Sequence, residues 1–276
     1  MKTKAGEEIT KDSIERSDLN YSMLRQVIIR ADFTSMLDAD RMTADLNDQE
    51  WFRGAFNNYS RLRFADTLQP QGNGHMDMDS REEWSPRFIR RFDDCNIGAE
   101  KKVLLDITNE SICMVIQCDD KYESIDDYLS LVINTLHFII SRDQYVKIRR
   151  LAIRKFDGEH FREHKEADNV FEYFDQRIMF HEKGDRFWQR SYTDNFIYGE
   201  TGVKVNYTRT VKTTPKEEER LVFILDIDTY LDSELIKNER PCKEELESIF
   251  NEELNETAFD LFKRGVKLEF LLSKLK

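Results

Sequence analysis

Apolar residues recur along this chain with two spacings, and each spacing predicts a type of secondary structure. Runs rich in β-branched and aromatic residues, which are typical of strands, occur at 26–33, 103–107, 111–118, 145–156, 196–198, 203–207 and 221–230. Ile125, Leu129 and Val132 open a series of apolar residues three or four positions apart, which predicts a helix up to residue 140. Helices are also expected at 38–56 and 243–274.

The links between the strands favour antiparallel pairing. Only residues 108–110 separate two of the predicted strands, which indicates a hairpin. In strand 145–156 the apolar side chains change faces between Ile148 and Leu151, which indicates a β-bulge.

These elements predict an α+β fold of mostly antiparallel sheets in two similar halves, each covered by a long helix. Along the chain we expect a flexible N-terminal arm at 1–20, a first α+β half at 21–165 and a second α+β half at 166–276 that ends in the long helix. Residues 104–107 and 224–227 read Leu-Leu-Asp-Ile and Ile-Leu-Asp-Ile, which is compatible with a diverged duplication.

The composition is typical of a folded protein that stays in water. The 276 residues include 19 Phe, 10 Tyr and 3 Trp, whereas disordered chains contain few aromatic residues. The longest apolar runs, such as 221–225, are far shorter than the ~20 residues that span a bilayer. The first residues lack the apolar stretch of a secretory signal, and the four cysteines suit a reducing compartment. We therefore expect a cytoplasmic protein that does not enter membranes.

Charge is distributed unevenly along the chain. There are 42 Lys and Arg against 54 Asp and Glu, a net charge of −12, and residues 215–260 hold 15 acidic and 5 basic residues. An acidic total argues against general binding to nucleic-acid phosphates and leaves only a local contact through the basic segment 142–155. We expect a basic protein partner on an acidic face formed by Glu217, Glu218, Glu219, Glu244 and Glu245. A candidate basic face comprises Arg149, Arg150, Arg154 and Lys155.

Two patterns match metal sites. His160, Glu163 and His164 form an H-x-x-E-H sequence, in which two histidines on one helix can share a zinc ion. Here the segment leaves a predicted strand and no third ligand is apparent, so we interpret it as a charged surface segment. Asp226 and Asp228 lie two positions apart on a strand and therefore point to one face. Paired carboxylates can bind a metal or act as acid and base, but on a half-solvated strand we expect them to face water.

A third pattern resembles a nuclease site. Asp94, Glu100 and Lys102 imitate the carboxylates and the lysine that hold Mg²⁺ and the scissile phosphate in PD-(D/E)xK enzymes. In those enzymes the ExK sequence lies on a strand, whereas Glu100 precedes one here, so we interpret the match as chance. Phosphate-loop, nucleophile-elbow and dinucleotide motifs are absent from the sequence, and we expect no cofactor.

The order of several segments resembles a sporadically distributed bacterial family of about 250 residues with no settled function. The similarity rests on 24–33, 148–154, 225–230 and 245–262 and would cover about residues 20–270. The family has no known catalytic residues, so the resemblance implies no site. Its patchy distribution is like that of mobile and defence-linked genes, and this implies a role in antiviral defence.

Three functions follow from these observations. The favoured one is a non-enzymatic interaction protein, an accessory or adaptor subunit that binds a larger, nucleic-acid-handling partner. A homodimer is also expected, because exposed sheet edges and a long terminal helix can pair symmetrically. The first alternative is a small-ligand-sensing module with a pocket between sheet and helix. The second is a metal-dependent hydrolase that uses the His160 set or the Asp226 set.

Overall fold

The computed structural model describes residues 9–19, 23–64, 87–98, 102–118, 124–161, 169–172, 189–199, 202–213 and 221–275. The strands are β1 (Leu24–Phe33), β2 (Phe56–Phe64), β3 (Arg87–Cys95), β4 (Lys102–Ile107), β5 (Ser111–Gln117), β6 (Ile148–Phe161), β7 (Gln189–Tyr198), β8 (Val203–Thr213) and β9 (Leu221–Asp232). The helical segments are η1 (Arg16–Asp18), α1 (Ala39–Asn47), α2 (Glu50–Arg53), α3 (Asp126–Arg142), α6 (Lys243–Ser248), the π-helix η2 (Ile249–Asn255), α7 (Glu256–Gly265) and α8 (Leu268–Leu272).

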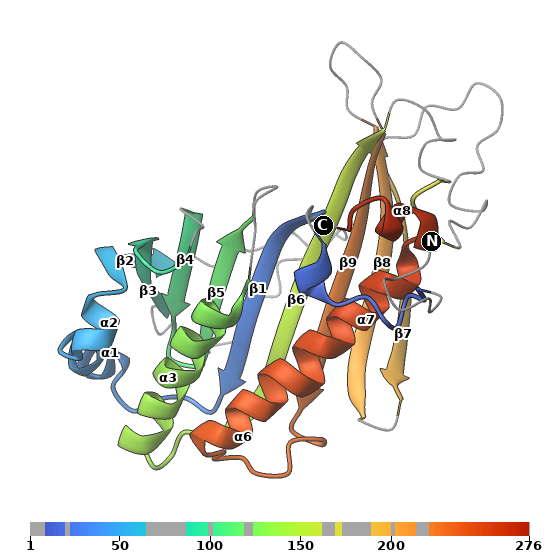
Figure 1. Ribbon diagram of the computed structural model, residues 1–276. Coiled ribbons are helices and arrows are strands. Elements are labelled where there is room, and N and C mark those ends of the chain that lie inside the picture. Colours follow the sequence, from blue (N-terminus) through green and yellow to red (C-terminus); the bar gives the residue numbers. More distant parts are fainter. Residues whose placement is uncertain are drawn as a thin grey trace, which may run out of the picture.

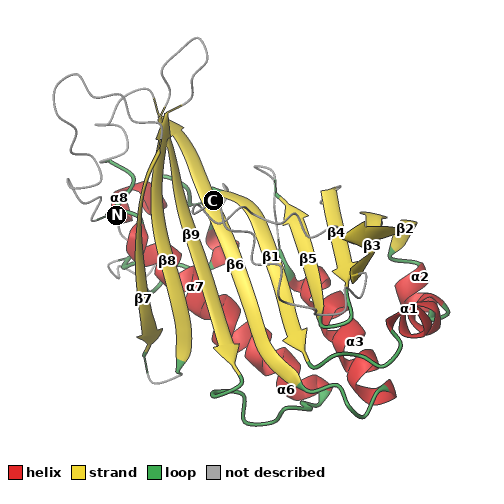
Figure 2. Cartoon of the chain, turned by 180° about the vertical axis from the view of Figure 1, so that it is seen from behind, coloured by secondary structure: helices red, strands yellow, loops and turns green. Residues whose placement is uncertain are grey.

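All of these strands belong to one nine-stranded sheet. Its order is β2-β3-β4-β5-β1-β6-β9-β8-β7, and every pairing is antiparallel. Helices α3, α6 and α7 lie across one face of the sheet (Figure 1). Seen from behind, the strands have no described helix in front of them (Figure 2). We call this uncovered side the open face.

The expected division into two halves, each covered by a long helix, is wrong. β1 pairs with β6, and β6 pairs along its length with β9, so strands from both sides of residue 165 form one sheet. The long helix expected at 243–274 is a series of shorter segments, α6, η2, α7 and α8. The apolar pattern of a strand shows which of its faces is buried, but it does not identify the neighbouring strand. For that reason the bridging role of β6 was not visible in the sequence.

Several local predictions are confirmed. Helix α3 spans the predicted segment, and β4 and β5 form the predicted hairpin. The bulge is also present, because Phe33 pairs with Ile148 while Asp32 pairs with Arg150, which leaves Arg149 as the extra residue. In contrast, the helix expected at 38–56 is two short helices, α1 and α2.

The sheet is buried on the helix side only. Along β9, fully buried and half-buried residues alternate without a break. Two apolar clusters lie under the helices, a larger one around α3 and β1 and a smaller one that includes Phe171, Phe223 and Leu271. Ile14, in the segment expected as an arm, is buried in the smaller cluster. No helix in the described part of the chain is apolar and long enough to cross a bilayer.

Gly265 ends α7 at a point of close contact with β8. A methyl group at this position would overlap the hydroxyl group of Tyr207, and Leu225 lies close by on β9. Tyr207 is largely buried there, and burial raises the pKa of its hydroxyl to about 12. Glycine is therefore required for the helix to approach the sheet this closely.

Replacing Gly265 with alanine is expected to lower the free energy of unfolding by about 2 kcal/mol, as overpacking does in a close-packed core. The double variant Gly265→Ala/Tyr207→Phe removes the overlapping hydroxyl and should recover most of that loss. Urea denaturation of both variants, with Tyr207→Phe alone as the control, measures the effect. A Gly265→Ala protein as stable as the native chain would show that α7 and β8 do not pack in this way.

Candidate functional site

The open face carries a ladder of ion pairs. We use the term charged ladder for its members, which are Arg30, Asp32, Arg91, Asp106, Arg150, Asp228, Arg154, Asp226, Lys204 and Asp232. They come from β1, β3, β4, β6, β8 and β9, so the ladder crosses most of the sheet. Each cation in it is matched by a carboxylate on the same or a neighbouring strand.

The pairs of the charged ladder are closely bonded. Arg154 makes two hydrogen bonds to Asp226, at 2.7 and 2.6 Å, and hydrogen bonding to this carboxylate raises the pKa of the guanidinium. Arg91 and Asp106 make two bonds of 2.8 Å between directly opposed residues. Such two-fold bonds are the strongest arginine–carboxylate contacts. Because they join neighbouring strands, they also stabilise the register of the sheet.

Aromatic residues complete the ladder in its central part. The guanidinium of Arg150 lies 4.4 Å from the ring centre of Tyr230, and that of Arg154 lies 4.7 Å from the ring centre of Phe156. Arg150 also donates to Asp228 at 2.9 Å. The arginines are thus held flat on the sheet, and their charge is neutralised there.

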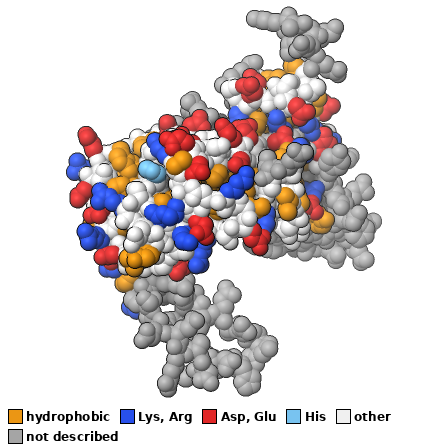
Figure 3. Space-filling view, turned by 90° about the horizontal axis from the view of Figure 1, so that it is seen from below, with side chains coloured by type: hydrophobic (Ala, Val, Ile, Leu, Met, Phe, Trp, Pro, Cys, Tyr) orange, Lys and Arg blue, Asp and Glu red, His pale blue; other side chains and the backbone are white. Residues whose placement is uncertain are grey.

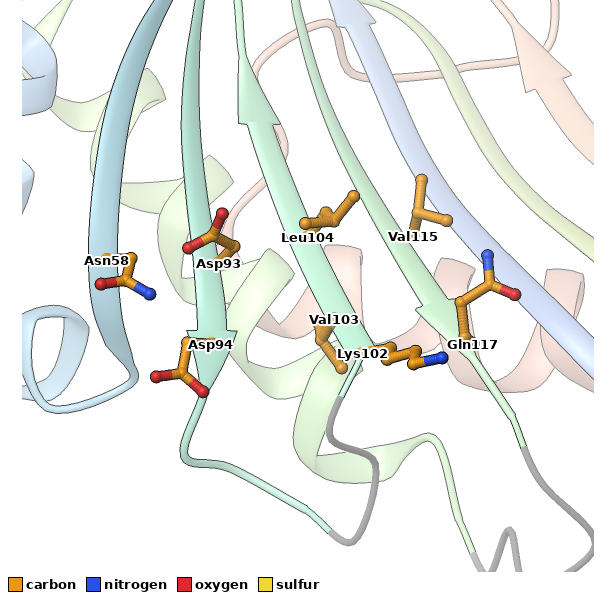
Figure 4. Close-up of a pocket in the computed structure, with 8 residues that line it drawn as sticks. All are labelled: Asn58, Asp93, Asp94, Lys102, Val103, Leu104, Val115 and Gln117. Atoms are coloured by element: carbon orange, nitrogen blue, oxygen red, sulfur yellow. The ribbon is translucent and has the colours of Figure 1, made fainter.

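A pocket of about 530 Å³ opens on this face between β2 and β5. It is lined by Asn58, Asp93, Asp94, Lys102, Val103, Leu104, Val115 and Gln117 (Figure 4). Leu104 of β4 is paired with Val115 of β5. Two residues along the same strands, Lys102 is paired with Gln117. The pocket therefore has carboxylates on the β3 side, an apolar floor and a lysine on the β4 side. Its volume is in the range of small-molecule binding sites.

Asp93 is the chemically unusual residue of the pocket. Its Oδ1 atom is buried and has no hydrogen-bond partner. An unsatisfied buried acceptor costs roughly 1–3 kcal/mol. The neighbouring guanidinium of Arg91 is already committed to Asp106. Asp93 therefore interacts with Arg91 through charge, while its Oδ1 atom has no hydrogen-bond donor among the described residues.

Asp94 is placed beside Asp93 by an unusual backbone conformation. Its φ is 55°, in the left-handed region, which aspartate tolerates better than most residues. The amide of Asn57 donates to Asp94 at 3.0 Å and to Asn96 at 2.9 Å. The turn after β3 is therefore held in a conformation that leaves Asp94 exposed at the mouth of the pocket.

The structure brings together two sets that the sequence suggested separately. Asp226 and Asp228 do lie on one face, where they bind Arg154 and Arg150 of the candidate basic set. Carboxylates held by arginine are poorly suited to a metal ion. Within the part of the chain that the structure describes, no group of three potential metal ligands occurs.

The remaining basic candidates do not share that surface. Arg149 is the exposed extra residue of the bulge, and Lys155 is buried on the helix side of β6. On the side of the molecule seen from below, acidic and basic side chains are interspersed (Figure 3).

Of the acidic candidates, Glu244 and Glu245 are exposed at the start of α6. Glu245 accepts hydrogen bonds from the Cys242 amide and from Asn238, which lower its pKa. Glu217, Glu218 and Glu219 lie outside the described residues.

The metal and nuclease patterns are only partly described. His160 is exposed on β6 opposite Val222, whereas Glu163 and His164 lie outside the described residues. Asp94 and Lys102 of the nuclease-like pattern do line one pocket, and Glu100 lies outside the described part. Among the charged residues that line the pocket, the one that the sequence did not single out is Asp93. Its proximity to Asp94 and Lys102 was the available signal.

A second polar cluster is buried between the sheet and the π-helix. Lys155 and Asp157 point to the helix side of β6, and both are more than nine-tenths buried. The Lys155 amino group donates to Asn255 at 2.6 Å, while Oδ2 of Asp157 has no hydrogen-bond partner. The carbonyl group of Leu254 in η2 accepts a hydrogen bond from Thr229 at 3.1 Å. The π-helix thus presents the Asn255 side chain and the Leu254 carbonyl group to the sheet.

Burial shifts both ionisable groups of this cluster. It lowers the pKa of Lys155 to about 7, with repulsion from Arg16 acting in the same direction, and it raises the pKa of Asp157 to about 7. The other charged or titratable groups that act on the pair are Arg25, Cys118 and Glu256. The cluster is closed to solvent, and we interpret it as structural.

No protein-family model matches the chain, and no curated protein is significantly similar to it in sequence.

The free energy of unfolding is expected to have a local minimum near pH 7. Between about pH 4 and 7 the folded chain retains a proton on Asp157 that the unfolded chain has lost, so stability falls as pH rises. Between about pH 7 and 10 the unfolded chain retains a proton on Lys155 that the folded chain has lost, so stability rises. Each slope is at most about 1.4 kcal/mol per pH unit.

Urea denaturation from pH 5 to 9 measures this profile. In Asp157→Asn the free energy of unfolding should no longer fall as the pH rises toward 7. In Lys155→Met it should no longer rise above pH 7. A native chain whose free energy of unfolding does not vary between pH 5 and 9 would contradict the burial of Lys155 and Asp157.

Proposed function

We propose that this chain is a non-enzymatic, cytoplasmic accessory protein that binds a basic protein partner through the open face. In this proposal a lysine or arginine side chain of the partner enters the pocket at Asp93. The proposal rests on one observation, a pocket on the open face where the adjacent carboxylates Asp93 and Asp94 lie beside an apolar floor.

The shape and chemistry of the pocket suit a long basic side chain. Asp93 and Asp94 offer carboxylates to its charged end, while Leu104 and Val115 offer an apolar surface to its methylene groups. With Lys102 included, the lining residues have a net charge of −1. A cation is therefore favoured over an anion, and Lys102 remains available to an acidic group of the partner.

The charged ladder supports a protein partner rather than nucleic acid. Its arginines are neutralised by Asp106, Asp226 and Asp228 within the sheet. Binding to nucleic acid depends on cations that can replace the counterions of phosphates. A surface whose charges are already paired can instead be covered by another protein without leaving an isolated buried charge.

A small cationic ligand is the competing occupant. The pocket volume would admit one, as the ligand-sensing alternative requires. We favour a protein because the pocket is open and lies within a broad, charge-balanced surface of the sheet. The two possibilities are separated by the experiment below.

Asp93→Asn is expected to weaken partner binding roughly ten- to hundredfold, since a charge-assisted hydrogen bond contributes about 1.5–3 kcal/mol. Its thermal stability should change little, because Oδ1 of Asp93 has no hydrogen-bond partner among the described residues. Asp232→Asn is the matched control, since Asp232 lies on the same face and is paired with Lys204. Zero-length carbodiimide crosslinking in host lysate, followed by mass spectrometry, would join Asp93 or Asp94 to a lysine of the partner.

Titrations with agmatine and with Mn²⁺ test the alternatives directly. Tight binding of agmatine without any crosslinked protein would replace the proposal with a ligand-sensing function. Binding of Mn²⁺ that Asp93→Asn abolishes would replace it with a metal-dependent activity. Equal capture of the same protein by the native chain and by Asp93→Asn would also overturn it.

A further inference from the structure

Strand β7 is an edge of the sheet, and its outer side has no partner strand in the part of the chain that the structure describes. The strand order ends at β7, and all ten of its residues pair with β8 (Figure 2). A long edge strand presents a row of backbone N–H and C=O groups to which another strand can be added.

β7 also exposes large apolar side chains on both of its faces. Tyr192 and Phe196 lie on the helix side, opposite Arg209 and Val205 of β8, and Ile197 lies on the open face. Their exposed fractions are 48%, 38% and 62%. A further strand beside β7 would cover these side chains by cross-strand contacts.

The opposite edge of the sheet is protected against self-pairing. β2 contains two arginines and no acidic residue. Arg61 is bound to Asp40 and lies 3.9 Å from the ring centre of Phe88. Arg63 has no carboxylate partner among the described residues, so two copies of β2 side by side would bring unneutralised like charges together, which opposes pairing. The sequence of β7 contains one arginine and one aspartate, so two copies of β7 meet without net charge.

We infer that two copies of this chain pair antiparallel through β7 and form one continuous sheet. A two-fold axis at Asp194 places Tyr192 of each copy opposite Phe196 of the other, and aromatic pairs of this kind stabilise a strand pair. Arg209 binds Asp194 within each copy, which reduces repulsion at the axis. The contact uses the same surface on both copies and closes after two.

This arrangement has a consequence for binding. The pocket lies between β2 and β5, and β7 is at the other end of the strand order. A dimer through β7 therefore leaves both pockets open, one toward each end of the joined sheet. It presents two binding sites on one rigid body, which favours partners that are themselves dimeric or repetitive.

Analytical ultracentrifugation of the full chain tests the inference. At micromolar concentrations, the molar mass obtained for the native protein is expected to be twice that of one chain. Thr193→Lys/Ile197→Lys places like charges on both copies of β7 and should sediment as a monomer. The matched control Leu62→Lys changes an exposed apolar residue of β2, and it should remain a dimer. Asp93→Asn should also remain a dimer, so failure of the pocket and failure of the dimer are distinguishable.

A monomeric native chain would overturn the inference, and so would a dimer that survives Thr193→Lys/Ile197→Lys. If that variant does not fold, as judged by circular dichroism, hydrogen–deuterium exchange of the native chain decides. β7 amides should exchange as slowly as those of β9 at high concentration and faster after dilution. Fast exchange of β7 at every concentration would contradict the pairing.

Discussion

Burial of the sheet on one face only is the constraint on which the rest of this structure depends. With helices on a single side, every strand must alternate between inward apolar and outward polar residues, and a shift by one residue would reverse the two sets. β6 joins β1 and β9, two strands from distant parts of the chain, into this sheet. The bulge at Arg149 allows Ile148 and Leu151 to be buried on the same side. On the open face, Arg154 and Asp226 would separate if the register shifted.

The same constraint accounts for the least favourable feature of the fold. Lys155 and Asp157 occupy inward positions of β6, where apolar residues would be expected from the alternation. Burying ionisable groups is costly unless they are bonded, and the π-helix η2 supplies Asn255 as one partner. This buried pair shows that the chain tolerates a local cost to keep β6 continuous.

The sequence was informative where structure is local. The period of apolar residues identified α3, the three-residue link identified the β4–β5 hairpin, and the change of face in β6 identified its bulge. The sequence did not show that the strands form one continuous sheet, because β1 pairs with strands more than seventy residues away along the chain.

The pocket was missed for a different reason. β3 contains Arg90 at an inward position, where Asp40 of α1 binds it at 2.7 Å, and this interrupts the apolar alternation that would have revealed a strand. Asp93 therefore did not stand out as a residue of an open sheet face, although the adjacent Asp94 was noted as one member of a nuclease-like pattern.

Together, these features describe a broad surface with paired charges and one unpaired carboxylate oxygen. In the proposed complex the partner covers the open face and not the helices. Hydroxyl-radical footprinting of the chain, alone and bound to its crosslinked partner, measures which of the two surfaces is covered. Oxidation of Leu104 and Val115 is expected to fall on binding, while that of the exposed Trp51 on α2 should not change. Protection of Trp51 with unchanged oxidation of Leu104 and Val115 would contradict it.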